Sequence, residues 1–179
     1  MKEYNKIPIS ELGKNSGIKL EVCETEHDLY WKMAIEVFEL IKENNEKNKD
    51  TVMIVPYGPV GPYSRLVYLI NKYRLSLKNC YFINMDEYLD DNRQYIDIQD
   101  PLSFRGGMDR VFYSRIDDEL NMPVDHRIFP EPGNEEYIWK IIQELGGLDM
   151  CFGGVGINGH IAFNEPPEPG EEISNDEFK

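Results

Sequence analysis

Residues 148–152 read LDMCF and run directly into GGVG at 153–156, so a short apolar stretch ends in glycines. A short apolar run that follows an amphipathic helical pattern, here residues 137–145, is typical of a buried strand in an α/β sheet. Two more apolar runs, Thr51–Val55 and one that starts at Cys80, alternate with helical patterns in the same way. This alternation predicts a three-layer, mostly parallel, Rossmann-like sheet with helices on both faces.

The remaining elements fit one domain that covers residues 1–179, of which 41% are apolar. Residues 24–48 have the spacing of an amphipathic helix, and Thr25 is suited to be its N-cap. We expect further helices through residues 66–70, 108–115 and 137–145, with a short run at 127–129 between the last two.

The loop after the 148–152 strand, GGVGINGHIAFNEP at 153–166, holds an imidazole, two amides and a carboxylate. In open parallel sheets, ligands bind beyond the carboxyl ends of the strands. His160 and Glu165 therefore occupy a position where proton-transfer groups collect. On this loop alone the alternative is equally open, namely turn-forming glycines with a surface histidine.

A second strand, from Cys80 onward, runs straight into the carboxylates of Asp86 and Glu87. A partly desolvated carboxylate can act as a general base because burial raises its pKa toward neutrality. An isolated Asp-Glu pair has an alternative role as an acidic turn that caps the next element. The coincidence of two strand ends that both carry ionisable groups favours a catalytic site over that alternative.

These motifs carry a resemblance to a known family. Asn84-Met85-Asp86-Glu87-Tyr88, followed by GGVG at 153–156 and GHIAFNEP at 159–166, resembles the glucosamine-6-phosphate deaminase (isomerase) family. Ser103-Phe104 and residues 108–112 add similarity between the two motifs. The resemblance is patchy from about residue 51 and strong at the motifs. It implies an aldose–ketose isomerisation coupled to loss of ammonia, from glucosamine 6-phosphate to fructose 6-phosphate, with no metal and no organic cofactor.

The resemblance also implies roles for individual residues. His160 would open the sugar ring, with Glu165 orienting and stabilising its imidazole. Asp86, favoured over Glu87, would move a proton between C2 and C1 of the open chain. Tyr88 and the loop glycines, Gly154, Gly156 and Gly159, are expected to contact the substrate.

Asn158 departs from the family pattern, which has an aspartate two residues before the histidine. An amide can accept a hydrogen bond from the ring, but it cannot offset an imidazolium charge. Three outcomes stay open: a working deaminase that relies on Glu165, a slow one, or a relative with altered chemistry. A further hypothesis is that the Asn158-Gly159 step deamidates and supplies the missing acid.

The turn after the first strand, PYGPVGPYSR at 56–65, is a second departure. Backbone amides near Gly58 and Gly61 at a helix start can bind a phosphate, but prolines contribute no amide proton. Ser64 and Arg65 are expected to compensate for the missing donors. The alternative for Arg65 is a solvated helix residue.

Charge and composition narrow the expected partners. A net charge of -14 argues against nucleic acid and anionic membranes. The expected partner, a phosphorylated amino sugar, is itself anionic and must therefore be held by a local positive field. Three scattered cysteines and the lack of an apolar leader or span predict a cytoplasmic protein with reduced, buried thiols. A homo-oligomer is among the expected states.

Three readings of the chain remain. The favoured one is a glucosamine-6-phosphate deaminase. The alternatives are a 6-phosphogluconolactonase-like hydrolase, which shares a glycine-histidine loop, and a catalytically impaired sugar-phosphate sensor, motivated by Asn158. The proline- and glutamate-rich residues 165–179 resemble an acidic loop or lid, a poor end for a compact sheet, so we expect the chain to be a fragment.

Overall fold

The computed structural model describes residues 7–14, 17–134, 136–157, 159–162, 164, 165, 167, 170, 171, 173 and 174. The helices and strands follow one another as α1 (Glu26–Glu46), β1 (Thr51–Val55), α2 (Gly61–Tyr73), β2 (Cys80–Asn84), α3 (Phe104–Val111), β3 (Arg127–Ile128), α4 (Glu136–Glu144) and β4 (Met150–Cys151). Short 3-10 turns lie at η2 (Ile9–Glu11), η3 (Tyr113–Arg115) and η4 (Val124–His126).

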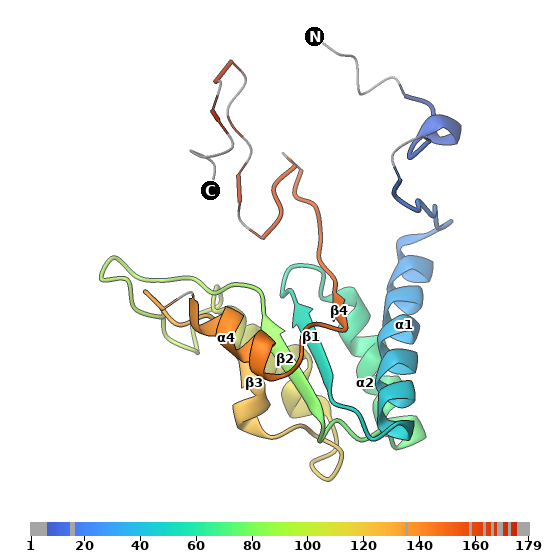
Figure 1. The fold of residues 1–179 in the computed structure, drawn as a ribbon, viewed down its shortest axis with the longest axis vertical. Coiled ribbons are helices and arrows are strands. Elements are labelled where there is room, and N and C mark those ends of the chain that lie inside the picture. Colours follow the sequence, from blue (N-terminus) through green and yellow to red (C-terminus); the bar gives the residue numbers. More distant parts are fainter. Residues whose placement is uncertain are drawn as a thin grey trace.

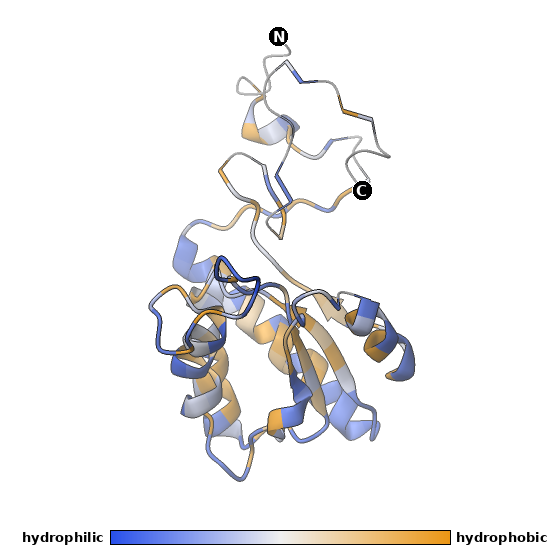
Figure 2. Cartoon of the chain, turned by 90° about the vertical axis from the view of Figure 1, so that its left-hand side faces the viewer, coloured by the Kyte–Doolittle hydropathy of each residue, from blue (hydrophilic) through white to orange (hydrophobic). Residues whose placement is uncertain are grey.

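The four described strands form one parallel sheet in the order β3-β2-β1-β4. Side chains of α1, α2 and α3 pack on one face against Met53 and Phe82. On the other face, α4 packs through Ile142 against Val52 and Ile83. Helices therefore cover both faces, and the predicted three-layer α/β fold is confirmed (Figure 1). Hydrophobic residues gather in the strands and on the helix sides turned toward them (Figure 2).

Helix α1 begins where the sequence predicts. The Thr25 hydroxyl accepts a hydrogen bond from the Asp28 amide, and the Asp28 carboxylate accepts one from the Thr25 amide. This reciprocal pair satisfies two amides that a helix start otherwise leaves unpaired. The helix then buries Ala34, Val37 and Ile41 against α2 and the sheet.

Helix α3 begins at Phe104, four residues before the predicted position, and ends at Val111. Ser103 caps it by accepting a hydrogen bond from the Gly106 amide. Gly106 and Gly107 disfavour a helix by propensity, but close packing requires them here. A Cβ at Gly106 would lie 1.9 Å from the Ile98 carbonyl oxygen, and one at Gly107 would lie 2.2 Å from the Tyr57 ring.

Helix α2 also begins early, at Gly61 instead of residue 66. Gly61 packs closely against the Tyr30 ring of α1. A Cβ added at Gly61 would lie 2.2 Å from that ring, so only glycine fits. The earlier start places Ser64 and Arg65 inside the helix rather than in the turn that precedes it.

The sheet contains a reversal in strand order that positions the site. From β1 the chain adds β2 and then β3 on one side, and it returns through α4 to place β4 on the other side of β1. The segments after β1 and β4 therefore leave the sheet next to each other, although β4 was reached from the opposite direction. Such a reversal is where open parallel sheets form a crevice for ligands.

Two sequence expectations concern the thiols and membrane spans. All three cysteines are free, but only Cys80 is buried, and burial raises the pKa of its thiol to about 12. Cys151 is exposed, so its predicted burial is wrong. It lies on β4, the edge strand of the described sheet, where no described element covers it. Within the described part of the chain, no helix combines the length and apolar character that a bilayer crossing requires.

Candidate active site

A cavity of about 290 Å³ lies at the carboxyl ends of β1, β2 and β4, at the reversal in strand order. Segments far apart in the sequence contribute its walls. The described lining residues are Pro56, Gly58, Pro59, Met85, Asp86, Phe104, Gly154, Val155, Gly156, His160 and Ala162. The structure thus brings Asp86 and His160, predicted from separate strand ends, to one cavity.

Asp86 reaches the cavity from a firmly held strand end. The Asn84 side chain is buried and donates to the Ile128 carbonyl at 3.0 Å, which ties β2 to β3. One residue further, the Met85 amide donates to the Val55 carbonyl at 2.9 Å and extends the pairing of β2 with β1. The two residues before Asp86 are therefore each hydrogen-bonded to a neighbouring strand or its end, which fixes the backbone that carries Asp86.

The Asp86 carboxyl has the electrostatic character of a base. Burial raises its pKa above the ordinary value of 3.8, and the neighbouring Glu87 charge adds to the rise, whereas His160 opposes it. Tyr63, a buried phenol of α2, also faces this carboxyl, and burial holds its own pKa well above the usual range. A half-buried carboxylate with a raised pKa accepts a proton more readily than an ordinary aspartate, as a general base must.

His160 is held by its own loop. Its carbonyl accepts a hydrogen bond from the Gly156 amide, and the Gly159 amide donates to the Gly156 carbonyl, both at 2.9 Å. The imidazole folds back over Gly156, where an added Cβ would lie 2.5 Å from Nε2. Gly159 has a φ of 92°, a backbone conformation that favours glycine. The glycines of this loop therefore place the ring.

Glu165 completes the arrangement. Its Oε1 lies 2.9 Å from Nδ1 of His160, so the carboxylate engages one ring nitrogen and leaves Nε2 as the nitrogen that lies over Gly156. A carboxylate at Nδ1 selects the tautomer that carries the proton there and stabilises the imidazolium when the ring gains a second proton. Asn158, the other predicted partner of this ring, lies outside the described residues.

The other predicted binding residues divide into two groups. Gly58, Gly154 and Gly156 line the cavity. Gly61, Ser64, Arg65, Tyr88 and Gly159 are not among its lining residues.

Arg65 is engaged at the α1–α2 interface instead of the cavity. It donates to the Gly61 carbonyl at 2.8 Å and lies 3.0 Å from Nδ1 of His27. Its guanidinium also lies over the rings of Tyr30 and Trp31. Ser64 donates to the same Gly61 carbonyl, at 3.3 Å.

Glu87 has a different place from Asp86. Its side chain is 1% exposed and turns away from solvent into the start of α3. Both its oxygens accept hydrogen bonds there, from the amides of Phe104 and Arg105, each at 2.8 Å. The capping alternative for the acidic pair is therefore realised by Glu87 and not by Asp86. Sequence reasoning offered capping for the pair as a whole and did not divide the two roles between its residues, and it missed Phe104 as a cavity wall.

This chain is similar to several known glucosamine-6-phosphate deaminases. No model of a protein family matches it. A glucosamine-6-phosphate deaminase from Borreliella afzelii is 34% identical over 155 residues, which are 83% of this chain and 56% of the relative. One from Fusobacterium nucleatum is 35% identical over 74% of this chain and 48% of its own length. One from Caenorhabditis elegans is 36% identical over 70% of this chain and 47% of its own length.

A solved structure of a monomeric glucosamine-6-phosphate deaminase has the same fold. It superimposes with a TM-score of 0.68 at 27% identity and covers 83% of this chain and 60% of the solved one. The chain spans about half the length of the curated relatives that it matches. Sequence motifs, fold and relatives agree, and the chain belongs to the glucosamine-6-phosphate deaminase family.

Proposed function

We propose that this chain carries the proton-transfer site of a glucosamine-6-phosphate deaminase, which converts glucosamine 6-phosphate and water to fructose 6-phosphate and ammonia. One observation supports the proposal above all. Asp86, with a raised pKa, and His160, oriented by Glu165, line the same cavity although they follow different strands. A sugar isomerisation needs two such groups, one for the ring and one for the carbon-bound proton.

The proposed steps balance without an added cofactor. His160 moves a proton from the anomeric hydroxyl to the ring oxygen and opens the ring. The Asp86 carboxylate then removes the proton from C2 and returns it to C1, while one proton of the amine passes to O1. Together these transfers convert the C1 aldehyde and C2 amine into a C1 alcohol and a C2 imine. Water adds to the imine carbon, and ammonia leaves with the nitrogen. Glu165 stabilises the imidazolium form of His160 during the first step.

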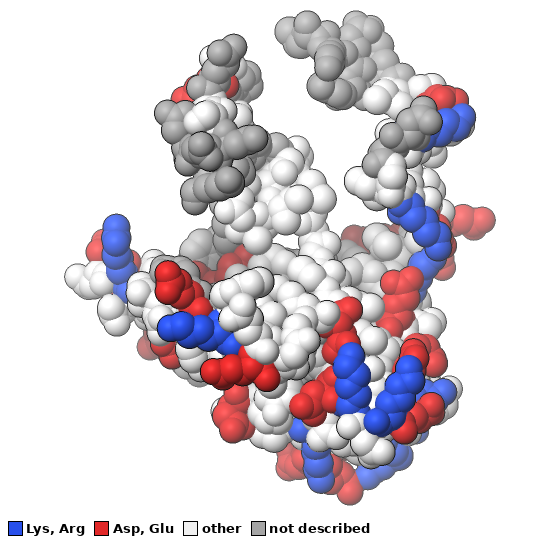
Figure 3. Space-filling model, viewed as in Figure 1, with Lys and Arg blue, Asp and Glu red and all other residues white. Residues whose placement is uncertain are grey.

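The phosphate has a less complete site than the sugar carbons. Among the described residues that line the cavity there is no Lys or Arg, and the turn after β1 contributes Pro56, Gly58 and Pro59. Figure 3 shows Asp and Glu interspersed with Lys and Arg over the viewed face rather than a basic patch. We propose Gly58 and the adjoining backbone as the phosphate contact that this part of the chain supplies.

Ammonia release from glucosamine 6-phosphate tests the proposed reaction, with exchange of the C1 proton for solvent deuterium as a second readout. We expect Asp86→Asn to slow both by about 10² to 10⁴, because an amide cannot carry the proton. Hydrolysis of 6-phosphogluconolactone in place of ammonia release would move the chain to the lactonase reading. Thermal stabilisation by glucosamine 6-phosphate without either reaction would move it to the sensor reading.

A further inference from the structure

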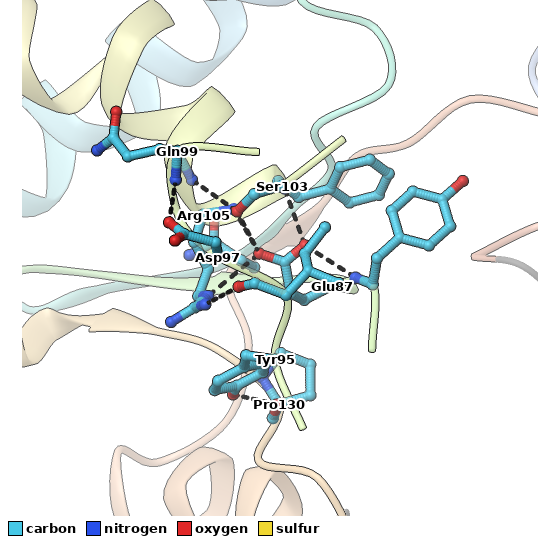
Figure 4. Close-up of polar contacts among 12 residues, drawn as sticks. Glu87, Tyr95, Asp97, Gln99, Ser103, Arg105 and Pro130 are labelled. Atoms are coloured by element: carbon cyan, nitrogen blue, oxygen red, sulfur yellow. Dashed lines mark hydrogen bonds and ion pairs between the residues drawn. The ribbon is translucent and has the colours of Figure 1, made fainter. Parts of the chain in front are cut away.

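Glu87 holds a buried cluster of hydrogen bonds behind the cavity, shown in Figure 4. Its carboxylate accepts from the Ser103 hydroxyl at 3.0 Å and from the Arg105 guanidinium at 3.2 Å, in addition to the two amides of α3. It also accepts from the Tyr88 amide at 2.8 Å. A carboxylate at the start of a helix gains both from these donors and from the helix dipole.

The same cluster fastens the loop between β2 and α3. Arg105 donates to the Ile96 carbonyl at 2.8 Å, and its guanidinium lies 4.1 Å from the centre of the Tyr95 ring. The Tyr95 hydroxyl in turn donates to the Pro130 carbonyl. Glu87 thus connects the end of β2, the 88–103 loop, α3 and the segment after β3.

Asp86 stands between two fixed points of the backbone. On one side, Met85 is bonded to β1, and on the other, Glu87 is bonded to the start of α3. Phe104, whose amide binds Glu87, is itself a wall of the cavity. Moving the Glu87 carboxylate would therefore move both the Asp86 side chain and the surface opposite it.

We propose that Glu87 is a positioning residue for the catalytic carboxylate, which holds Asp86 in the cavity through its bonds to the start of α3 and which supplies a fixed negative charge beside it. The inference rests on the proposed deaminase function for its kinetic consequence, but the placement and titration of Asp86 can be measured without turnover. Among the described residues, the charged and titratable groups that interact electrostatically with Asp86 are Glu87 beside it, His160 from the loop after β4 and Tyr63 from α2.

Two substitutions separate the effect of the Glu87 charge from the effect of its side-chain length. Glu87→Gln keeps the length and an acceptor oxygen but removes the charge. Glu87→Asp keeps the charge but shortens the side chain, so the carboxylate cannot reach the amides of Phe104 and Arg105 together. Thr25→Ala is the control, because it removes a helix cap of α1 that has no residue in the cavity lining.

The first readout is the titration of the Asp86 side-chain carbon by carbon-13 NMR in the full chain. We expect Glu87→Gln to lower the Asp86 pKa, because a neighbouring negative charge is lost. The Thr25→Ala control should lower the melting temperature and leave this titration unchanged. An unchanged Asp86 titration in Glu87→Gln would overturn the inference, even if the variant is less stable.

The second readout is ammonia release as a function of pH. We expect Glu87→Gln to move the acid limb of kcat to lower pH, and Glu87→Asp to reduce kcat about tenfold or more with the limb near its original position. Full kcat in Glu87→Asp would overturn the positioning role. If the unsubstituted chain releases no ammonia while the NMR shift is found, the proposed reaction fails and the placement of Asp86 by Glu87 stands.

Discussion

Asp86 is the residue whose protonation should control the rate. Burial raises its pKa above 3.8, and the reaction needs the carboxylate, so activity should fall as pH drops through that raised value. We expect the acid limb of kcat to lie above the position of an ordinary aspartate, and Asp86→Asn to lower kcat by about 10² to 10⁴. A pH profile of ammonia release measures both. A limb at or below pH 3.8 would contradict this role for Asp86.

Gly156 lies under the imidazole of His160, and no side chain fits there. In Gly156→Ala the new Cβ would lie 2.5 Å from Nε2, so the ring must move. We expect turnover to fall about a hundredfold, because a displacement of about 1 Å at a reacting group has that cost. Stability should change little, since the loop is exposed.

Gly154→Ala is the matched control for the position of the ring, because its added Cβ meets no atom within 4 Å. The ring resonances of His160, followed by nitrogen-15 NMR, should shift in Gly156→Ala and keep their place in Gly154→Ala. Equal shifts in the two variants would show that Gly156 has no special role under the ring.

At the scale of elements, β4 is short but carries the whole histidine loop. Asp149, just before it, accepts hydrogen bonds from the Val52 amide at 3.0 Å and from the Lys49 ammonium. Burial acts to raise the Asp149 pKa, but the bonds from Lys49 and Val52 outweigh it, and the pKa is lowered. A lowered pKa means that the ionised form stabilises the fold above pH 3.8 and that this contribution is lost as pH falls through the folded-state pKa.

We therefore expect Asp149→Ala to reduce the free energy of unfolding by about 1.5 to 3 kcal/mol at neutral pH, as for hydrogen bonds to a charged group. Lys49→Ala is the comparison, and it should cost at most about 1 kcal/mol because its side chain is 57% exposed. Urea unfolding at pH 7 and at low pH measures both. The difference in free energy of unfolding between Asp149→Ala and the unsubstituted chain should shrink as the pH falls. If it stays constant down to pH 2, the ionised form of Asp149 is not what stabilises the fold.

Sequence patterns predict the elements that depend on local signals. The capping box at Thr25, the apolar strands and the carboxylate and imidazole at strand ends all follow from short-range chemistry, and the sheet order then brings Asp86 and His160 together. Parallel strands share one carboxyl edge, so their terminal side chains can be expected to be neighbours.

Other positions depend on packing partners that lie far away in the chain. Gly106 and Gly107 are poor helix formers, yet α3 runs through both of them. Glycine is needed at these positions because Ile98 and Tyr57 leave no room for a Cβ. Arg65 was expected at the phosphate, but the early start of α2 places it against α1. The helix propensity of a residue contains no information about the distant residues that pack against it, in α3 or beside Arg65.

At the scale of the whole molecule, the net charge of -14 should oppose the approach of a sugar phosphate. Salt screens such repulsion, with a Debye length of about 30 Å at 0.01 M and about 10 Å at 0.1 M. We expect the KM for glucosamine 6-phosphate to fall as NaCl is raised over this range. Ligand binding by glucosamine, which lacks the phosphate, should be less sensitive to salt. A KM that rises with salt would instead reveal a local positive field that dominates the net charge.

The reversal of strand order between β1 and β4 has a consequence for how the protein acquires activity during synthesis. Asp86 leaves the ribosome early, with the first two strands, whereas His160 follows the last strand described, which must insert on the opposite side of β1. A nascent chain with only β1, β2 and β3 in place would hold a base with no ring-opening partner. Under the proposed function, turnover thus requires that β4 has docked beside β1, which makes turnover a sensitive assay of that one step.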